Sequence, residues 1–303
     1  MIPRNRYSKI INPLFLLGVL VYCFAVSAND YSQDLPLIPG EFVDVGTHRL
    51  HHRCIGKGRP TVVVDNGIAG SATEWYGIQS ALATHYRVCV YDRAGYVWSE
   101  PGPSPRTTRQ IANELQTLIS ESGESAPFVF IGHSFGGFTA MRMAVIMQER
   151  VVGIVLVDSS SPGVFFNHAR PSEILRNPIA VGAATGNDKV PSTPEEMARF
   201  LNSRRKALFV QMDEISNFET SAQQVTDFAN LTKLPMLVVA RDQNSQQLGA
   251  RDEVWRQAQI KLSQISQQGE LLIAEGSDHF IHLRKPAWLA EKIKAFIESL
   301  NPQ

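Results

Sequence analysis

The chain has 303 residues, of which 44% are hydrophobic and 19% are charged, with 29 basic and 29 acidic side chains. This composition suits a globular protein with a large core and excludes a disordered chain. Because the charges balance, no overall field favours nucleic acid or an anionic membrane, and we expect no nucleic-acid partner. The length fits one large domain, or one domain with a substantial insertion.

The N-terminal segment has the pattern of a signal peptide. Three basic residues lie within the first nine positions, an apolar stretch follows, and small residues end at Ala28. This order predicts export to the periplasm or the medium after cleavage, with residues 1–28 as signal peptide and residues 29–303 as the mature protein. Two alternatives remain open: an uncleaved membrane anchor formed by the same stretch, and a lipoprotein joined through Cys23.

Short apolar runs alternate with amphipathic segments through the mature chain. Residues 107–123, for example, carry apolar side chains at helical spacing and end at Gly123. The expected strands are two within 41–56, then 61–67, 86–95, 127–134, 151–160, 234–242 and 270–276, and the other expected helices are 135–150, 252–266 and 286–300. Continuous apolar strands alternating with helices predict a mostly parallel sheet with helices on both faces.

One long segment, residues 162–234, interrupts this alternation. It contains no run typical of a core strand, and its residues 191–212 and 221–231 are helical and amphipathic. The segment is too long for a plain connection between strands. We interpret it as a helical cap over a substrate site, and the alternative is a surface excursion unrelated to function.

Four segments of the mature chain carry motifs at the ends of predicted strands. Residues 132–136, "GHSFG", fit the G-x-S-x-G nucleophile elbow, with a strand before and a helix after. The other three are "VVVDNGIAGSATEW" after the third strand, "YDRAGYVWSE" after the fourth and "EGSDHFIHLRKP" after the last. In their order along the chain the four segments resemble the α/β-hydrolase superfamily along nearly all of the mature chain. The resemblance implies an eight-stranded, mostly parallel α/β-hydrolase sheet with a helical cap inserted after strand 6.

The elbow makes Ser134 the candidate nucleophile. A tight turn from strand to helix projects its side chain outward, and the nearby glycines relieve crowding. The helix that follows directs its free N–H groups toward developing negative charge, so the Phe135 N–H is a candidate oxyanion donor. The resemblance implies that the second donor is the N–H of Ile68.

Among the eight histidines, His279 is the candidate base. It follows the last strand on a short loop, in the chain order serine then histidine. His133 adjoins the nucleophile but is expected to point away from it. His282 is the second choice and is expected to be a polar surface residue. Arg93, in the segment after the fourth strand, is expected to hold that loop.

The acid has more than one candidate. In the common arrangement of the family it follows the strand 234–242, where the count falls on Asn244 and the nearby carboxylate is Asp242. In another arrangement of the family it ends the preceding strand, and Asp158 lies there, 24 residues after Ser134. We favour Asp158 over Asp242, with Asp252 as a further alternative.

Removal of the leader leaves two cysteines, Cys54 and Cys89. From the residues alone they are either small buried hydrophobic side chains or a pair in an oxidising compartment. In the fold that the resemblance implies, the second strand lies antiparallel beside the fourth, so a disulfide between them is the favoured prediction.

A serine with a histidine and an acid supports acyl transfer to water. We expect a serine hydrolase that cleaves a carboxylic ester, or a related acyl bond, of a small molecule through an acyl-enzyme, with no cofactor, no metal and no obligatory protein partner. The alternatives are an aminopeptidase or amidase of the same superfamily and an inactive binding protein with its fold.

Overall fold

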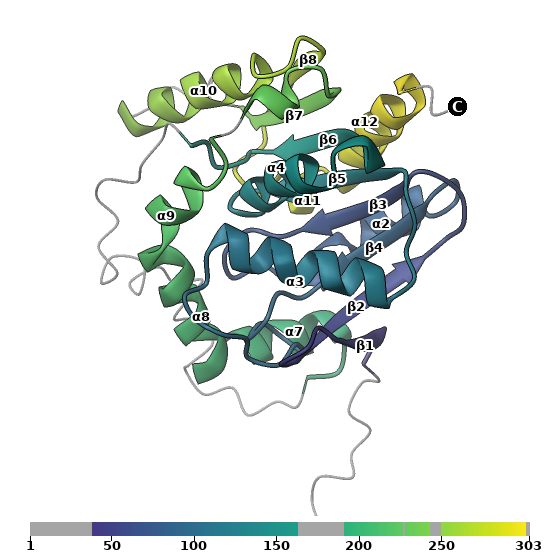
Figure 1. Ribbon diagram of the computed structural model, residues 1–303, viewed down its shortest axis with the longest axis vertical. Coiled ribbons are helices and arrows are strands. Elements are labelled where there is room, and N and C mark those ends of the chain that lie inside the picture. The colour runs from purple at the N-terminus through teal and green to yellow at the C-terminus, as the bar shows by residue number, and fades with distance from the viewer. Residues whose placement is uncertain (1–37, 163–190, 227, 243–249, 301–303) are drawn as a thin grey trace, which may run out of the picture. The chain divides into compact units, whose positions relative to one another are not determined.

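The apolar runs predicted as strands pair into one sheet in the computed structural model, which describes residues 38–162, 191–226, 228–242 and 250–300. The strand order is β1-β2-β4-β3-β5-β6-β7-β8 (Figure 1). β2 is antiparallel to both of its neighbours, and the other neighbouring strands are parallel. The strands are β1 (Glu41–Asp44), β2 (Arg49–Ile55), β3 (Thr61–Asp65), β4 (Arg87–Tyr91), β5 (Phe128–His133), β6 (Val151–Val157), β7 (Met236–Arg241) and β8 (Gly269–Ala274).

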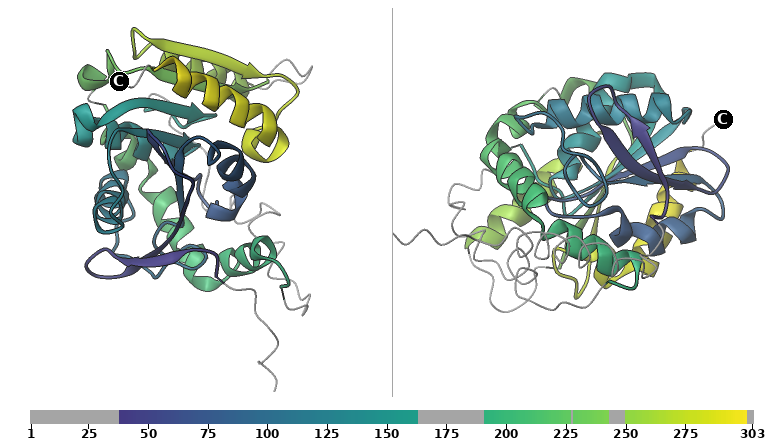
Figure 2. Two further views of the ribbon diagram at one scale, coloured as in Figure 1. Left: turned by 90° about the vertical axis from the view of Figure 1, so that its right-hand side faces the viewer. Right: turned by 90° about the horizontal axis from the view of Figure 1, so that it is seen from below.

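Helices connect the strands and cover both faces of the sheet (Figure 2). They are η1 (Ala72–Trp75), α2 (Tyr76–Leu82), α3 (Thr108–Glu121), α4 (Gly136–Met147), η2 (Gln148–Arg150), α7 (Pro194–Asn202), α8 (Arg205–Ser216), α9 (Phe218–Gln223), η3 (Phe228–Leu231), α10 (Ala250–Ser263), α11 (Ile281–Arg284) and α12 (Pro286–Ser299). α3 begins at a Thr107 N-cap whose side chain accepts the Gln110 N–H.

The central strands divide their side chains between two cores because successive residues of a strand point to opposite faces. In β5, Phe128 and Phe130 join the core under α3 and α4, while Val129 and Ile131 join the core under α2 and α12. All four side chains are at most 1% exposed. Burial on both faces explains why these strands are continuously apolar rather than alternating.

Cap helices α7 and α8 come from the long insertion, and the predicted eight-stranded, mostly parallel sheet with helices inserted after β6 is confirmed. A third apolar cluster joins Ala198, Ala207 and Val210 of the cap to Tyr96 and Val97 in the loop after β4. The predicted segments 1–28 and 162–234 fall partly or wholly on residues outside the described ranges, so their boundaries stay predictions. No helix within the described ranges is both long and apolar enough to span a membrane.

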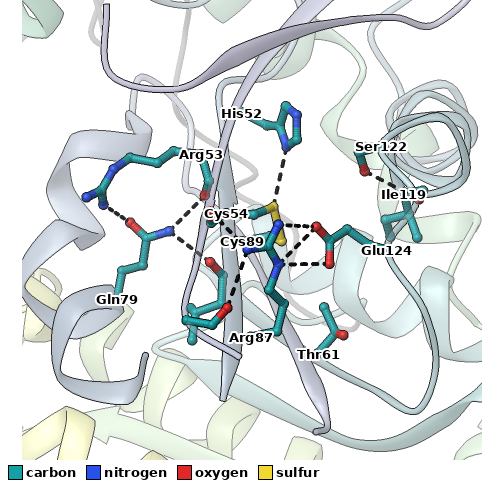
Figure 3. The surroundings of a disulfide bond; sticks show 12 residues. His52, Arg53, Cys54, Thr61, Gln79, Arg87, Cys89, Ile119, Ser122 and Glu124 are labelled. Carbon is teal, nitrogen blue, oxygen red and sulfur yellow. Dashed lines mark hydrogen bonds and ion pairs between the residues drawn. A yellow bond between two sulfur atoms is a disulfide. The ribbon is translucent and has the colours of Figure 1, made fainter. Parts of the chain in front are cut away.

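The disulfide predicted between β2 and β4 joins Cys54 to Cys89, which are direct cross-strand partners (Figure 3). Arg87, beside it, donates to the Cys54 carbonyl at 3.2 Å and pairs with Glu124 at 2.7 Å. The bond therefore links the antiparallel edge of the sheet to its parallel centre.

Candidate active site

Ser134 lies on a sharp turn between β5 and α4. Its φ is 51°, a left-handed value that is uncommon for a residue with a side chain. A Cβ at Gly132 would lie 2.4 Å from the Gly136 oxygen, and a Cβ at Gly136 would lie 2.4 Å from the Asp65 oxygen. These two positions require glycine because backbone atoms occupy the space that a side chain would need, and this is why the turn is rich in glycine.

Asp158 leaves β6 at the same level as Ser134 leaves β5. The two residues directly follow His133 and Val157, which are register partners in the parallel ladder. The Ser134 N–H donates to the Val157 oxygen at 3.2 Å. Asp158 also has a positive φ, 39°, and it is fully buried.

The structure brings His279 to Asp158. His279 lies between β8 and α11, and its Nδ1 is 2.5 Å from Asp158 Oδ2. A carboxylate at Nδ1 accepts the proton there and leaves Nε2 as the basic nitrogen. In the described ranges no hydrogen bond joins the His279 ring to the Ser134 hydroxyl, a bond that often tightens only when substrate is present.

Two further side chains that sequence reasoning missed hold the Asp158 carboxylate. Trp255 of α10 donates its indole N–H to Oδ1 at 2.9 Å. Arg241 at the end of β7 donates its backbone N–H to Oδ1 at 3.2 Å and its Nη1 to Oδ2 at 3.4 Å. With His279, these donors occupy both oxygens, as a buried carboxylate requires.

The other acid candidates have other contacts. Asp242 accepts the Gly276 N–H at 2.7 Å and so ties the ends of β7 and β8 together. Asp252 pairs with Arg241 at 3.0 Å. Asn244 lies outside the described ranges.

The two expected oxyanion donors, the N–H groups of Phe135 and Ile68, donate no hydrogen bond to another described residue. The backbone carbonyl oxygen of Ser134 accepts the Gly137 N–H at 3.1 Å and the Ser160 N–H at 2.9 Å. In a planar trans peptide the N–H points opposite to the C=O, so this holds the Phe135 N–H away from those partners. The loop that carries Ile68 is near the serine, because a Cβ at Gly67 would lie 3.1 Å from Ser134 Cβ.

The His133 ring packs against both His279 and His282, with ring centroids 4.7 and 4.4 Å away. His133 donates from Nε2 to the backbone carbonyl oxygen of His279 at 3.0 Å and so holds the loop between β8 and α11 in place. Burial, and then the neighbouring His282 and His279, hold the pKa of His133 well below its ordinary value. The prediction that His282 lies on the surface is wrong: it is 1% exposed, and its ring stacks on Trp75.

Arg93 contacts the loop after β4 that it was expected to hold, since its carbonyl oxygen accepts the Tyr96 N–H at 2.9 Å, and its side chain also bonds the loop after β3. Its Nη2 donates to the Gly67 oxygen at 2.9 Å. As a possible metal site, the described ranges offer Cys54, Cys89 and Glu124 close together, but the two sulfur atoms are joined to each other. A disulfide sulfur carries no thiolate to bind a metal.

Comparison with known proteins identifies the family. The profile of the alpha/beta hydrolase family matches residues 62–292. The chain belongs to this family. Membership supports a hydrolase activity for this chain.

Individual relatives are distant or match in part. "Probable transporter efuK" of Hormonema carpetanum is 33% identical over 128 residues, which is 39% of this chain and 18% of that protein. A 2-hydroxy-6-oxo-6-(2'-aminophenyl)hexa-2,4-dienoic acid hydrolase of Metapseudomonas resinovorans is 28% identical over 121 residues, 39% of this chain and 42% of that one. The chain thus spans less than half of either relative.

A solved structure supports the fold. The enol-lactonase of Burkholderia xenovorans LB400 aligns with a TM-score of 0.66 at 18% identity, covering 85% of this chain and all of that one. At this identity the likeness shows the shared fold alone.

Proposed function

We propose that the protein is a serine hydrolase that cleaves a carboxylic ester of a small molecule, with Ser134 as nucleophile, His279 as base and Asp158 as the acid. The observation that carries the proposal is the 2.5 Å contact between His279 Nδ1 and the buried Asp158, beside a serine held at positive φ. This arrangement supplies the two conditions that a serine nucleophile needs: projection into the site and a base of fixed tautomer.

The proposed reaction has two halves. Ser134 Oγ attacks the ester carbonyl carbon while its proton passes to His279 Nε2, and the carbonyl electrons move to oxygen. When the C=O reforms, the bond to the alcohol oxygen breaks and His279 returns its proton to that leaving group. Water then attacks the acyl-serine by the same route, which releases the acid and restores Ser134.

Two backbone N–H groups are proposed to hold the oxyanion. Those of Phe135, which is buried, and Ile68, which is partly buried, donate to no described residue. Unpaired N–H groups at buried positions are rare in proteins without a ligand for them. A donor of this kind is worth about a hundredfold to a thousandfold in kcat.

Residues 1–28 and 162–234 keep their proposed roles as an export signal and a cap. Export accords with the disulfide, since such bonds persist in oxidising compartments.

The test is labelling with a fluorophosphonate probe in wild type, Ser134→Ala and Ser203→Ala. Ser203 is a matched control because, among the described residues, its hydroxyl bonds the Phe200 carbonyl oxygen at the end of its own helix and no residue of the proposed site. We expect labelling of wild type and Ser203→Ala and none of Ser134→Ala. An unlabelled wild type would overturn the proposal. Esters and amides of one acyl group would then separate ester cleavage from amidase activity.

A further inference from the structure

Arg93 is buried between the sheet and the cap, with all five of its N–H donors used. Nε and Nη2 donate to the two carboxylate oxygens of Glu214 at 2.9 and 3.0 Å. Nη1 donates to Asp65 Oδ1 at 2.9 Å and to the Asn66 oxygen, and Nη2 also donates to the Gly67 oxygen at 2.9 Å. A guanidinium with every donor paired in a rigid fork holds its partners in one geometry.

The bond to Gly67 sets the direction of the next N–H. The peptide between Gly67 and Ile68 is planar, so with its C=O directed at Arg93, the Ile68 N–H points to the opposite side. Gly67 itself lies against Ser134, where its built Cβ would be 3.1 Å from the serine Cβ. Arg93 therefore orients the N–H that is the proposed second oxyanion donor.

The partner that orients Arg93 comes from the cap. Glu214 belongs to α8 and is fully buried, and it also accepts the Tyr96 hydroxyl at 2.7 Å. That hydroxyl in turn accepts the Ala69 N–H at 3.3 Å. Burial alone would lower the pKa of Arg93, but neighbouring carboxylates, led by that of Glu214, outweigh it and raise the pKa well above its ordinary value.

The other cap helix, α7, contacts the loop after β3 as well. Asn202 at the end of α7 donates its side-chain amide to the Ala69 oxygen at 2.9 Å and accepts the Val97 N–H at 3.2 Å. Residues 66–70, here called the oxyanion loop, are thus held by both α7 and α8.

We propose that Glu214 is a positioning residue for the reaction. Through Arg93 it fixes the orientation of the Ile68 N–H, so that docking of the cap and assembly of the oxyanion site are one event. The inference rests on the proposed function, since Ile68 matters only as a donor to the oxyanion. It assigns the cap a share in transition-state stabilisation besides covering the substrate.

The test compares Glu214→Gln with Asp213→Asn, a neutralised carboxylate one position away on α8. Asp213 joins the same helix to the loop before α3 by accepting from Ser104 Oγ at 2.5 Å and Arg106 N at 3.2 Å, but it bonds no residue of the oxyanion loop. In Glu214→Gln an amide NH₂ faces a guanidinium N–H, so the two-point contact with Arg93 is broken.

The first measurement needs no turnover. Hydrogen exchange is followed at the amides of Ala69 and Gly70, which are hydrogen-bonded to Tyr96 Oη and the Gly67 oxygen. We expect about tenfold faster exchange in Glu214→Gln than in wild type, and wild-type exchange in Asp213→Asn. Equal exchange in the two variants overturns the proposed coupling.

The second measurement is hydrolysis of an activated ester. We expect Glu214→Gln to lower kcat by about tenfold to a hundredfold, with KM within about threefold of wild type, and to weaken a trifluoromethyl ketone inhibitor by a similar factor. Asp213→Asn should stay within about threefold of wild type on all three. A Glu214→Gln variant no slower than Asp213→Asn overturns the inference, while the fluorophosphonate result decides the proposed function separately.

If Glu214→Gln does not fold, Glu214→Asp replaces it. That change keeps the negative charge but shortens the side chain by one methylene, so the contacts of 2.9 and 3.0 Å with Arg93 cannot both be kept. We expect faster exchange at Ala69 and Gly70 and a loss in kcat of about threefold to tenfold, and no change in either measurement overturns the proposal.

Discussion

Replacement of Asp158 by asparagine tests the proposed triad most directly. The carboxylate accepts from Trp255 Nε1 and Arg241 N at Oδ1, and from His279 Nδ1 and Arg241 Nη1 at Oδ2. An asparagine has one oxygen and one NH₂, so one of these two positions must become a donor.

The contacts decide which position changes. An NH₂ at the Oδ1 position would face two N–H groups that cannot accept. At the Oδ2 position the NH₂ faces the His279 ring, whose Nδ1 can accept if the ring proton moves to Nε2. The other group near that position is Arg241 Nη1, at a longer distance of 3.4 Å. The variant therefore selects the tautomer whose Nε2 cannot take a proton from Ser134.

We expect kcat to fall by about a thousandfold to ten-thousandfold, which is about 4 to 5 kcal/mol in activation free energy, with little change in KM. The assay is steady-state hydrolysis of an activated ester. Asp242→Asn is the matched control, because it removes the carboxylate nearest to the other position that the family uses, and it should retain activity within about threefold. A large loss in Asp242→Asn with little loss in Asp158→Asn would refute the reasoning, and if neither variant loses about a hundredfold, both assignments are wrong.

Two further predictions concern the fold. A chain beginning at Asn29 should show no free thiol when it is unfolded without reductant, and a titration that finds two thiols would contradict the disulfide. Cys54 and Cys89 are 35 positions apart, so reduction of their bond should lower the free energy of unfolding by about 4 kcal/mol. The second prediction concerns His133, because burial lowers the pKa of its ring in the folded protein. Below the ordinary pKa of 6.5, His133 takes up a proton in the unfolded chain but not in the folded one. The free energy of unfolding should therefore decrease as the pH falls below 6.5, by up to about 1.4 kcal/mol per pH unit. Urea unfolding between pH 7 and 5.5 should therefore show a shallower pH slope for His133→Asn than for wild type, and equal slopes would contradict this cause.

The sheet and the elbow were predictable because their signals are local. Strands buried on both faces are continuous apolar runs, and the G-x-S-x-G pattern is contained in five consecutive residues, with Gly132 required by a backbone contact to Gly136 in the same turn. The Cys54–Cys89 disulfide needed more than a local signal, because it depends on the strand order that the resemblance implied.

The remaining parts of the site depend on contacts between distant segments. Trp255 meets Asp158 from 97 residues away, and Glu214 meets Arg93 from 121 residues away. Nothing in the amphipathic pattern of α8 distinguishes Glu214 from a solvated glutamate. His282 was misjudged for the same reason, since the stacking partner that buries it, Trp75, lies at the opposite end of the domain's sequence.

The register of β5 and β6 has a consequence for how the proposed triad moves. Ser134 and Asp158 each directly follow one member of the His133–Val157 pair, so two of the three groups are set by the same rung of the ladder. Their separation can change only if the centre of the sheet deforms, which is costly in a close-packed interior. His279 alone sits on a loop, so the mobility of that single side chain is the variable that heat or mutation should alter first, before either the nucleophile or the acid is displaced.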